Sequence, residues 1–167
     1  DGRVFARKYA TMADVWDACE RVDWLIWVYR RTVTPMDMRE LRLFACWCVR
    51  ETPLKDGRKV WDLLTDERSR NAVVVAERFA RGEATDEERS RAAAAAADAA
   101  YAAAAAAYAA YAAYAAYAAY AAYAAADADA AAYASASSAA YAAYAAAYAR
   151  KFQAEEFKRR FANPFHK

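Results

Sequence analysis

The sequence predicts an all-α fold, in which a small N-terminal helical bundle is followed by long alanine- and tyrosine-rich helices. Residues 92–149 are almost entirely alanine and tyrosine and contain no glycine or proline, and alanine has the highest helix propensity of all residues. The N-terminal half spaces its apolar residues at helical intervals, with capping and stop residues between the apolar segments. No segment alternates apolar and polar residues as a strand would.

Composition divides the 167 residues into three parts: an N-terminal helical region (1–84), long Ala/Tyr-rich helices (85–162) and a C-terminal tail (163–167). The net charge is +2, and no stretch is basic enough to predict nucleic-acid binding. Residues 92–149 lack leucine, isoleucine and valine and contain three aspartates. We therefore expect no membrane span there.

The first elements are a short basic lead-in over residues 1–11 and a helix over residues 11–31 that is interrupted near Val22. Helical spacing places five residues on its buried side: Trp16, Cys19, Leu25, Ile26 and Tyr29. Trp24 and Trp27 are expected to flank this side.

Thr34 is predicted to cap the next helix, with Pro35 at the first helical position and Asp37 completing a Thr-x-x-Asp box. One face of this helix carries apolar residues at helical spacing: Leu41, Phe44, Ala45 and Cys48. Pro53 ends the helix, and a turn containing Asp56-Gly57 follows.

A short apolar anchor is expected next, made of Val60, Trp61, Leu63 and Leu64. Thr65 is predicted to cap a third helix that ends at Gly82, and its inward residues are Ala72, Val75, Ala76 and Phe79. Thr85 and Glu88 form a capping box that begins the long helical part. That part ends near Ala162, before Asn163-Pro164.

The tyrosines of the long part follow two patterns. From Tyr108 to Tyr123 they recur every three residues, and a step of three turns about 300° around a helix, so the rings spiral around it. Tyr141, Tyr144 and Tyr148 instead follow the steps of a single seam. Aspartates and serines between Asp127 and Ser138 predict a reversal and an antiparallel hairpin. A single long rod is the alternative.

We interpret the tyrosines as a ladder of contact residues: Tyr101, Tyr108, Tyr111, Tyr114, Tyr117, Tyr120, Tyr123, Tyr133, Tyr141, Tyr144 and Tyr148. Tyrosine offers a large contact area at low entropic cost, which favours helix packing or self-assembly. A stacking surface for an aromatic polymer is a second interpretation. Transfer of an oxidising hole between neighbouring rings is a third.

The sequence predicts no enzyme, because it contains no phosphate loop, nucleophile elbow or zinc motif. Asp62, Asp66 and Glu67 form the one carboxylate group of interest, and their position favours helix capping. We expect no cofactor and no metal, since Cys46 and Cys48 face opposite sides of a helix. The three cysteines are typical of small buried residues in a reducing cytoplasm, the predicted location.

Four segments resemble a group of bacterial and phage proteins of uncharacterised function that end in alanine-rich helices: residues 43–48 (LFACWC), 60–73 (VWDLLTDERSRNAV), 76–88 (AERFARGEATDEE) and 163–165 (NPF). Some of those proteins are similar to a family of immunity proteins associated with polymorphic toxins. The resemblance implies an all-helical fold and a cytoplasmic role in binding a protein. The regular Tyr-Ala-Ala run departs from that group, in which charged residues interrupt the alanines, and favours packing or assembly.

These observations predict a non-enzymatic structural or interaction protein. Its expected partner is a second copy of the chain or another protein, with neither nucleic acid nor membrane as a partner. The alternatives are an immunity-like protein binder and a redox protein that uses the tyrosine ladder.

Overall fold

The structure is a computed structural model that describes residues 2–54, 56–110, 122–123 and 146–166, with only the backbone described at 103–110 and 146–147. The elements are α1 (Gly2–Ala6), α2 (Met12–Ala18), α3 (Val22–Thr32), α4 (Met38–Glu51), the 3-10 helix η1 (Val60–Leu63), α5 (Glu67–Ala80), α6 (Asp86–Ala110) and α9 (Ala146–Arg160). Within these ranges no strand occurs beyond an isolated bridge between Pro53 and Lys59. The predicted all-α class is confirmed.

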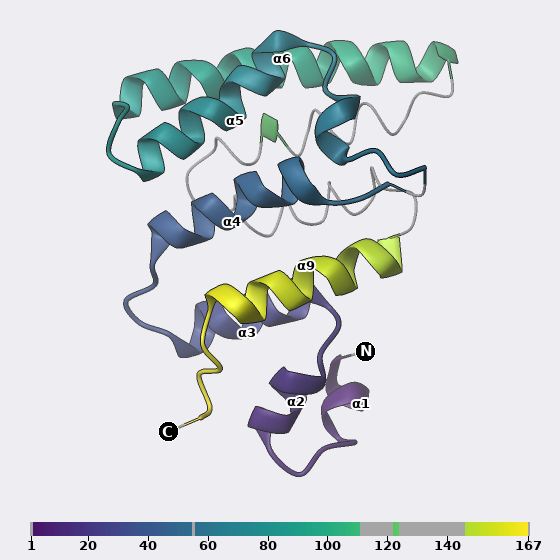
Figure 1. The fold of residues 1–167 in the computed structure, drawn as a ribbon, viewed down its shortest axis with the longest axis vertical. Coiled ribbons are helices and arrows are strands. Elements are labelled where there is room, and N and C mark those ends of the chain that lie inside the picture. Colours follow the sequence, from purple (N-terminus) through teal and green to yellow (C-terminus); the bar gives the residue numbers. More distant parts are fainter. Residues whose placement is uncertain (1, 55, 111–121, 124–145, 167) are drawn as a thin grey trace.

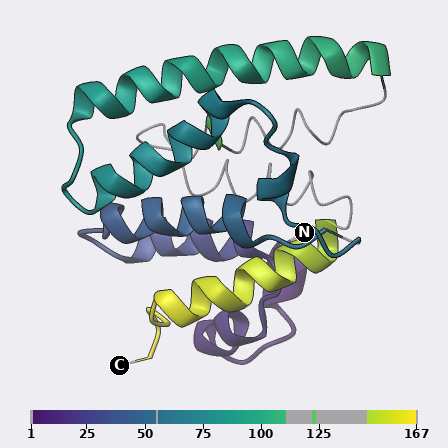
Figure 2. The ribbon, with the colours of Figure 1, turned by 45° about the horizontal axis from the view of Figure 1, so that its top comes forward.

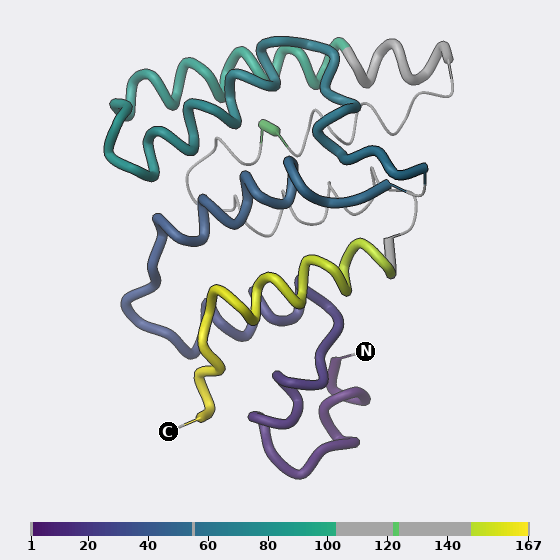
Figure 3. The backbone as a smooth tube through the Cα atoms, viewed as in Figure 1, coloured from purple at the N-terminus to yellow at the C-terminus, as the bar shows by residue number. Residues whose placement is uncertain are grey.

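The described helices form stacked layers (Figures 1 and 2). α5 and α6 lie side by side at one end, α4 lies next to α5, and α9 lies against α3 and α4. α1 and α2 are at the opposite end. The tube in Figure 3 shows that α9, although last in the sequence, returns to pack beside the early helix α3.

The first three helices are set by local hydrogen bonds and one tertiary contact. Thr11 caps α2 in a capping box with Asp14, and residues 19–21 interrupt the helix before α3, as the sequence predicts. The basic lead-in differs from the expectation, because its first residues form α1. α1 buries no residue of its own and lies on α3 through the Phe5 and Trp24 rings, whose centroids are 5.6 Å apart.

Two predicted caps are wrong, one by three positions and the other by one. Asp37, and not Thr34, caps α4, since the Asp37 carboxylate accepts a hydrogen bond from the backbone N–H of Glu40. Pro35 therefore lies before the helix, after a cis peptide bond with Thr34. Asp66, and not Thr65, caps α5. In both places aspartate supplies the cap in preference to a nearby threonine, in agreement with its slightly higher N-cap preference.

The end of α5 and the start of α6 match the sequence prediction. Gly82 has φ +79°, and the backbone N–H of Glu83 donates to the carbonyl of Arg78 over 2.8 Å, which is the pattern of a Schellman cap. Thr85 and Glu88 then form the predicted capping box: the Thr85 N–H donates to Glu88 Oε2 over 2.7 Å, and the Glu88 N–H donates to Thr85 Oγ1 over 3.2 Å.

An aromatic core joins α3, α4 and α9. Phe157 of α9 is fully buried, and its ring centroid lies 5.1 Å from that of Phe44 and 5.8 Å from that of Tyr29, both in edge-on geometry. Phe161 lies 4.9 Å from Tyr29, and Trp16 lies 6.0 Å from Phe157. Edge-on and tilted pairs are the favoured arrangement for buried aromatic rings.

The contact between α5 and α6 is made of small side chains. Five alanines of α6 are buried: Ala92, Ala93, Ala96, Ala99 and Ala100. The buried residues of α5 include the small side chains of Ala72, Val73 and Ala76, and α5 lies close to α6. Small residues at the crossing allow two helix backbones to approach closely.

Two groups of side chains connect the alanine layer to the aromatic core. Arg50 of α4 forms a bidentate ion pair with Glu77 of α5, with N–O distances of 2.5 and 2.9 Å. The guanidinium groups of Arg42 and Arg89 lie 5.1 and 5.3 Å from the ring centroid of Phe79. Because these residues come from α4, α5 and α6, they hold the two layers in register.

The ends of the long alanine-rich part are described, and its middle is not. α6 begins at Asp86, and α9 ends at Arg160, two residues before the predicted end. The expected reversal between Asp127 and Ser138, the hairpin and the alternative rod all lie outside the described residues.

Candidate functional site

Three of the eleven ladder tyrosines have described side chains. Tyr101 on α6 is 69% exposed and Tyr148 on α9 is 61% exposed. Tyr123 is half-buried and packs against the hydrophobic core, next to the fully buried Ala122. The described tyrosines therefore differ in environment, since Tyr123 packs inward and Tyr101 and Tyr148 are exposed.

The other ladder residues cannot be placed at the level of side chains. Tyr108 lies in α6, where only the backbone is described. Seven lie outside the described residues: Tyr111, Tyr114, Tyr117, Tyr120, Tyr133, Tyr141 and Tyr144. The spiral of rings, the single seam and the redox interpretation therefore stay predictions.

The carboxylates singled out in the sequence act as helix caps or as first-turn charges. Asp62 accepts a hydrogen bond from the backbone N–H of Lys59 over 2.8 Å, and Asp66 accepts one from that of Arg68 over 2.9 Å. Glu67 is a first-turn residue with an ion pair to Arg70 at 3.7 Å. The Arg68 guanidinium also hydrogen-bonds to Asp66 and lowers the pKa of that carboxyl below its usual value.

All three cysteines are buried and free, in agreement with the prediction of small buried residues. Burial raises the pKa of the Cys46 thiol to about 12, and burial also raises that of Cys48 well above its usual value. A thiol with a raised pKa is a poor nucleophile at neutral pH. In the described ranges, no group of three or more His, Cys, Asp or Glu side chains could hold a metal ion.

An apolar groove lies at the α1–α2 end of the molecule, and sequence reasoning missed it. It has a volume of about 500 Å³, and its walls come from α1, α2, α3 and Phe165 of the C-terminal tail. Its main lining residues are Phe5, Met12, Val15, Trp24, Trp27 and Val28. Trp27 is 55% exposed at the edge, and the Arg31 guanidinium lies 4.0 Å from its ring centroid.

Hydrogen bonds to α2 hold the C-terminal tail next to this groove, including one from Asn163 Nδ2 to the Ala13 carbonyl. Asp17 of α2 accepts a hydrogen bond from Asn163 Nδ2 over 2.9 Å, and its other oxygen lies 3.1 Å from His166 Nε2. Hydrogen bonding to His166 lowers the pKa of Asp17. These contacts place Phe165 in the groove wall, so the tail belongs to the candidate site.

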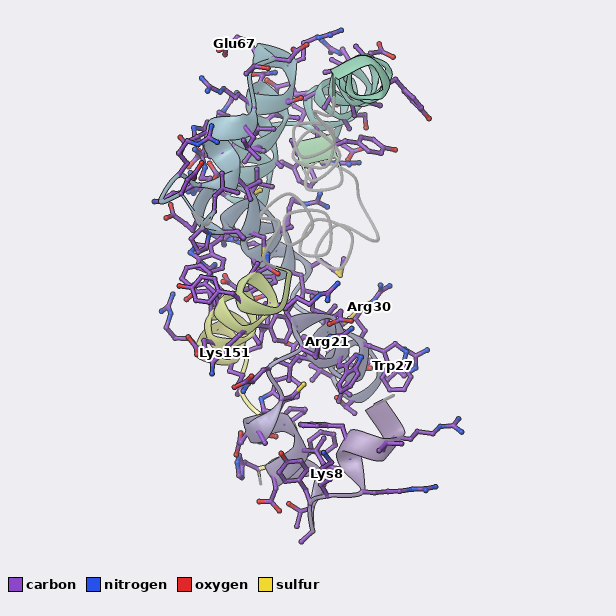
Figure 4. The ribbon with its side chains drawn as sticks, turned by 90° about the vertical axis from the view of Figure 1, so that its right-hand side faces the viewer. Lys8, Arg21, Trp27, Arg30, Glu67 and Lys151 are labelled. Carbon is purple, nitrogen blue, oxygen red and sulfur yellow. The ribbon has the colours of Figure 1, made fainter. Side chains whose placement is uncertain are left out.

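The groove lining contains one basic and one acidic residue, Arg3 and Asp23, and further basic residues lie on or next to the helices that form its walls. Arg7 and Lys8 follow α1, and Arg30 lies on α3 next to Arg31. Figure 4 shows Trp27 and Arg30 on the same side of the molecule, away from Lys151 of α9. The arrangement suits an apolar ligand that carries negative charge at its edge.

Comparison with protein-family models, with curated proteins and with solved structures finds no match for this chain. Among the described helices, none combines the length and the apolar character needed to cross a membrane. The function is therefore inferred from the residues and their geometry.

Proposed function

We propose that this chain is a non-enzymatic helical interaction protein that associates with copies of itself through its alanine–tyrosine helices. The observation that carries the proposal is the exposure of Tyr101 and Tyr148, at 69% and 61%. Each projects from a helix that is anchored to the fold by its other face. A tyrosine ring surrounded by alanines offers a large contact surface with few rotamers to fix.

The anchoring of the two helices differs, and this supports an outward role for the tyrosines. α6 is held to α5 through alanines such as Ala96, and α9 is held to the core through Phe157. Neither Tyr101 nor Tyr148 belongs to the hydrophobic core cluster, whereas Tyr123 packs against it. Both rings therefore present most of their surface to solvent, where a second molecule can contact them.

Sedimentation velocity of the double variant Tyr101→Ala/Tyr148→Ala tests the proposal. Alanine keeps the helix propensity of both sites, so the fold should persist. We expect self-association to weaken by about tenfold or more, because truncation of an interface tyrosine commonly costs over 1 kcal/mol. Val74→Ala is the control, because Val74 is an exposed apolar residue of α5. Unchanged association in the double variant would contradict the role of these tyrosines.

Binding of a different protein, as in an immunity-like role, is the second candidate function. The apolar groove between α1, α2 and α3 favours it, because exposed apolar concavities of this kind commonly mark sites of interaction. This candidate uses the opposite end of the molecule from α6. The two functions can therefore be separated by mutation.

A further inference from the structure

We infer that the groove between α1, α2 and α3 binds an acidic amphipathic segment of a partner protein, with an apolar side chain in the groove and carboxylates against the basic residues around it. The inference gives the second candidate function a partner chemistry, and it does not depend on self-association. It stands on the shape of the groove, its lining and the distribution of charge around it.

The shape and lining favour a protein side chain as the inserted group. A volume of about 500 Å³ holds one or two large apolar side chains. The lining is mainly aromatic and aliphatic, with Trp24 and Val28 in the wall and Trp27 half-exposed at the edge. Tryptophan in such a position is the residue type that most often dominates binding energy at protein interfaces.

The acidic residues of this region are already engaged within the molecule. Asp14 takes part in the α2 capping box, and Asp17 accepts from Asn163 and contacts His166. Glu20 forms an ion pair with Lys151 at 2.7 Å. Arg21 donates to Asp23 over 2.8 Å.

Asp23 lines the groove, and two opposing effects on its pKa show that Arg21 compensates its charge. Burial alone would raise the pKa of this carboxyl, but the hydrogen bonds and charge of Arg21 outweigh burial, and the pKa lies below its ordinary value. Asp23 therefore stays ionised and paired with Arg21. Its negative charge is not available to attract a basic ligand.

The nearby basic residues Arg7, Lys8 and Arg30 are exposed. No ion pair to an acidic side chain of the described chain is found for any of the three. Asp14 and Asp17 keep their negative charge in their hydrogen bonds, but basic residues outnumber acidic ones over residues 2–31 by six to four. The net charge of this region is positive, which complements a negatively charged partner.

A protein segment fits these features better than the other anionic macromolecules. A membrane surface does not require a concave pocket, because apolar side chains insert into it directly. Nucleic acid would need polar groups to contact base edges or a row of phosphate contacts, and the groove wall is mostly apolar. An amphipathic helix meets both requirements of the site, because it offers an apolar side chain for the groove and carboxylates for the basic residues.

Fluorescence anisotropy with two labelled synthetic peptides tests the inference. One is an amphipathic helical peptide with leucine and tryptophan on one face and glutamate on the other, and the second has lysine in place of every glutamate. We expect the glutamate peptide to bind at least about tenfold more tightly than the lysine peptide. Equal binding of the two peptides, or no binding of the glutamate peptide at about 1 mM, would overturn the inference.

Three variants localise the binding. Trp27→Ala should weaken binding of the glutamate peptide by about tenfold or more, because it removes the aromatic anchor. Arg30→Glu should weaken binding of the glutamate peptide severalfold, and this loss of affinity should be smaller at high salt, because salt screens the interaction between the charges. Arg91→Glu is the control, because it makes the same charge change at an exposed site of α6, far from the groove. An equal loss in Arg91→Glu would show a non-specific charge effect and would contradict a site in the groove.

Two further probes separate the macromolecule classes. Vesicles of phosphatidylglycerol and single-stranded oligodeoxythymidine should bind weakly and without dependence on Trp27. Trp27-dependent binding that favours either probe over the glutamate peptide would assign the groove to a membrane or to nucleic acid and overturn the inference. Tyr101→Ala/Tyr148→Ala should leave peptide binding unchanged. The self-association proposal and the peptide-binding inference can therefore fail independently of each other.

Discussion

The two described packing regions of this molecule bury helix surfaces with side chains of opposite size. Around α3, α4 and α9, large rings such as Phe44, Tyr29 and Phe157 fill the core edge to face. Between α5 and α6, alanines such as Ala96 meet small side chains of the neighbouring helix. The first region gains stability from the area buried per residue, and the second gains it from close backbone approach and helix propensity.

This difference predicts how each region responds to mutation. The aromatic region should be most sensitive to loss of volume, because a removed ring leaves a cavity. The alanine region should be most sensitive to added volume, because nothing can move aside between two close helices.

The largest expected effect is that of Phe157→Ala. Phe157 is fully buried and contacts rings from α2, α3 and α4, so the change should lower the free energy of unfolding by about 3–5 kcal/mol. Urea unfolding followed by circular dichroism measures it. Tyr148→Ala, an exposed position of the same helix, should cost less than about 0.5 kcal/mol. Similar costs at both positions would contradict the claim that the aromatic region depends on the volume of its buried rings.

Ala96→Leu tests the alanine region by adding volume. Ala96 has no exposed surface between α5 and α6, and overpacking of a close contact should cost about 1–3 kcal/mol. Ala94→Leu on the exposed side of α6 should be neutral within about 0.5 kcal/mol. If Ala96→Leu were stabilising in urea unfolding, the contact would contain space and the account of close packing would be wrong.

Acid should weaken the ionic contacts of Glu156 in α9. Burial alone would raise the pKa of Glu156, but hydrogen bonds from Arg159 and Arg160 outweigh burial and leave the pKa below 4.5, its ordinary value. A carboxyl whose pKa is lower in the folded state contributes stability above the unfolded pKa and loses it as pH falls through the folded value.

Glu156→Gln should therefore cost about 1 kcal/mol at pH 7 and progressively less as pH falls below about 4.5. Urea unfolding of the variant and the wild type at a series of pH values measures this difference. A difference that stays constant down to the acid limit would show that Glu156 acts through packing rather than through its charge.

The smallest expected effects distinguish a predicted cap that the structure confirms from a predicted cap that the structure does not use. Thr85→Ala removes the Oγ1 atom that accepts a hydrogen bond from the Glu88 N–H and should cost about 1 kcal/mol. Thr65→Ala, at a position that the sequence predicts as a cap and the structure does not use, should cost less than about 0.5 kcal/mol. Equal costs in thermal or urea unfolding would contradict the assignment of Asp66 as the cap.

Local chemistry explains which parts of the fold can be predicted from the sequence. Gly82 and the Thr85–Glu88 pair were predicted correctly because each depends on residues within one helical turn. Thr34 was predicted wrongly because it stands three residues before Asp37, and either residue could cap the following helix. Only the observed hydrogen bond to the N–H of Glu40 selects Asp37.

Long-range contacts explain what the sequence could not predict. The groove needs α1 to lie on Trp24 and needs Phe165 to reach α2 through the Asn163–Asp17 hydrogen bond, a contact across 146 positions. Neither feature has a local pattern. The exposure of Trp27 gives a partial indication, since its sequence position already places it beside the predicted buried face of α3 rather than on it.

The oligomeric state of the wild-type chain tests the central claim most directly. Multi-angle light scattering across a concentration series from about 5 to 500 μM, a range that covers typical weak protein association, gives the molar mass without a shape assumption. Self-association through the tyrosine-bearing helices predicts a mass that rises above the 18.5 kDa of one chain as concentration increases. A constant mass of 18.5 kDa across the series would contradict it.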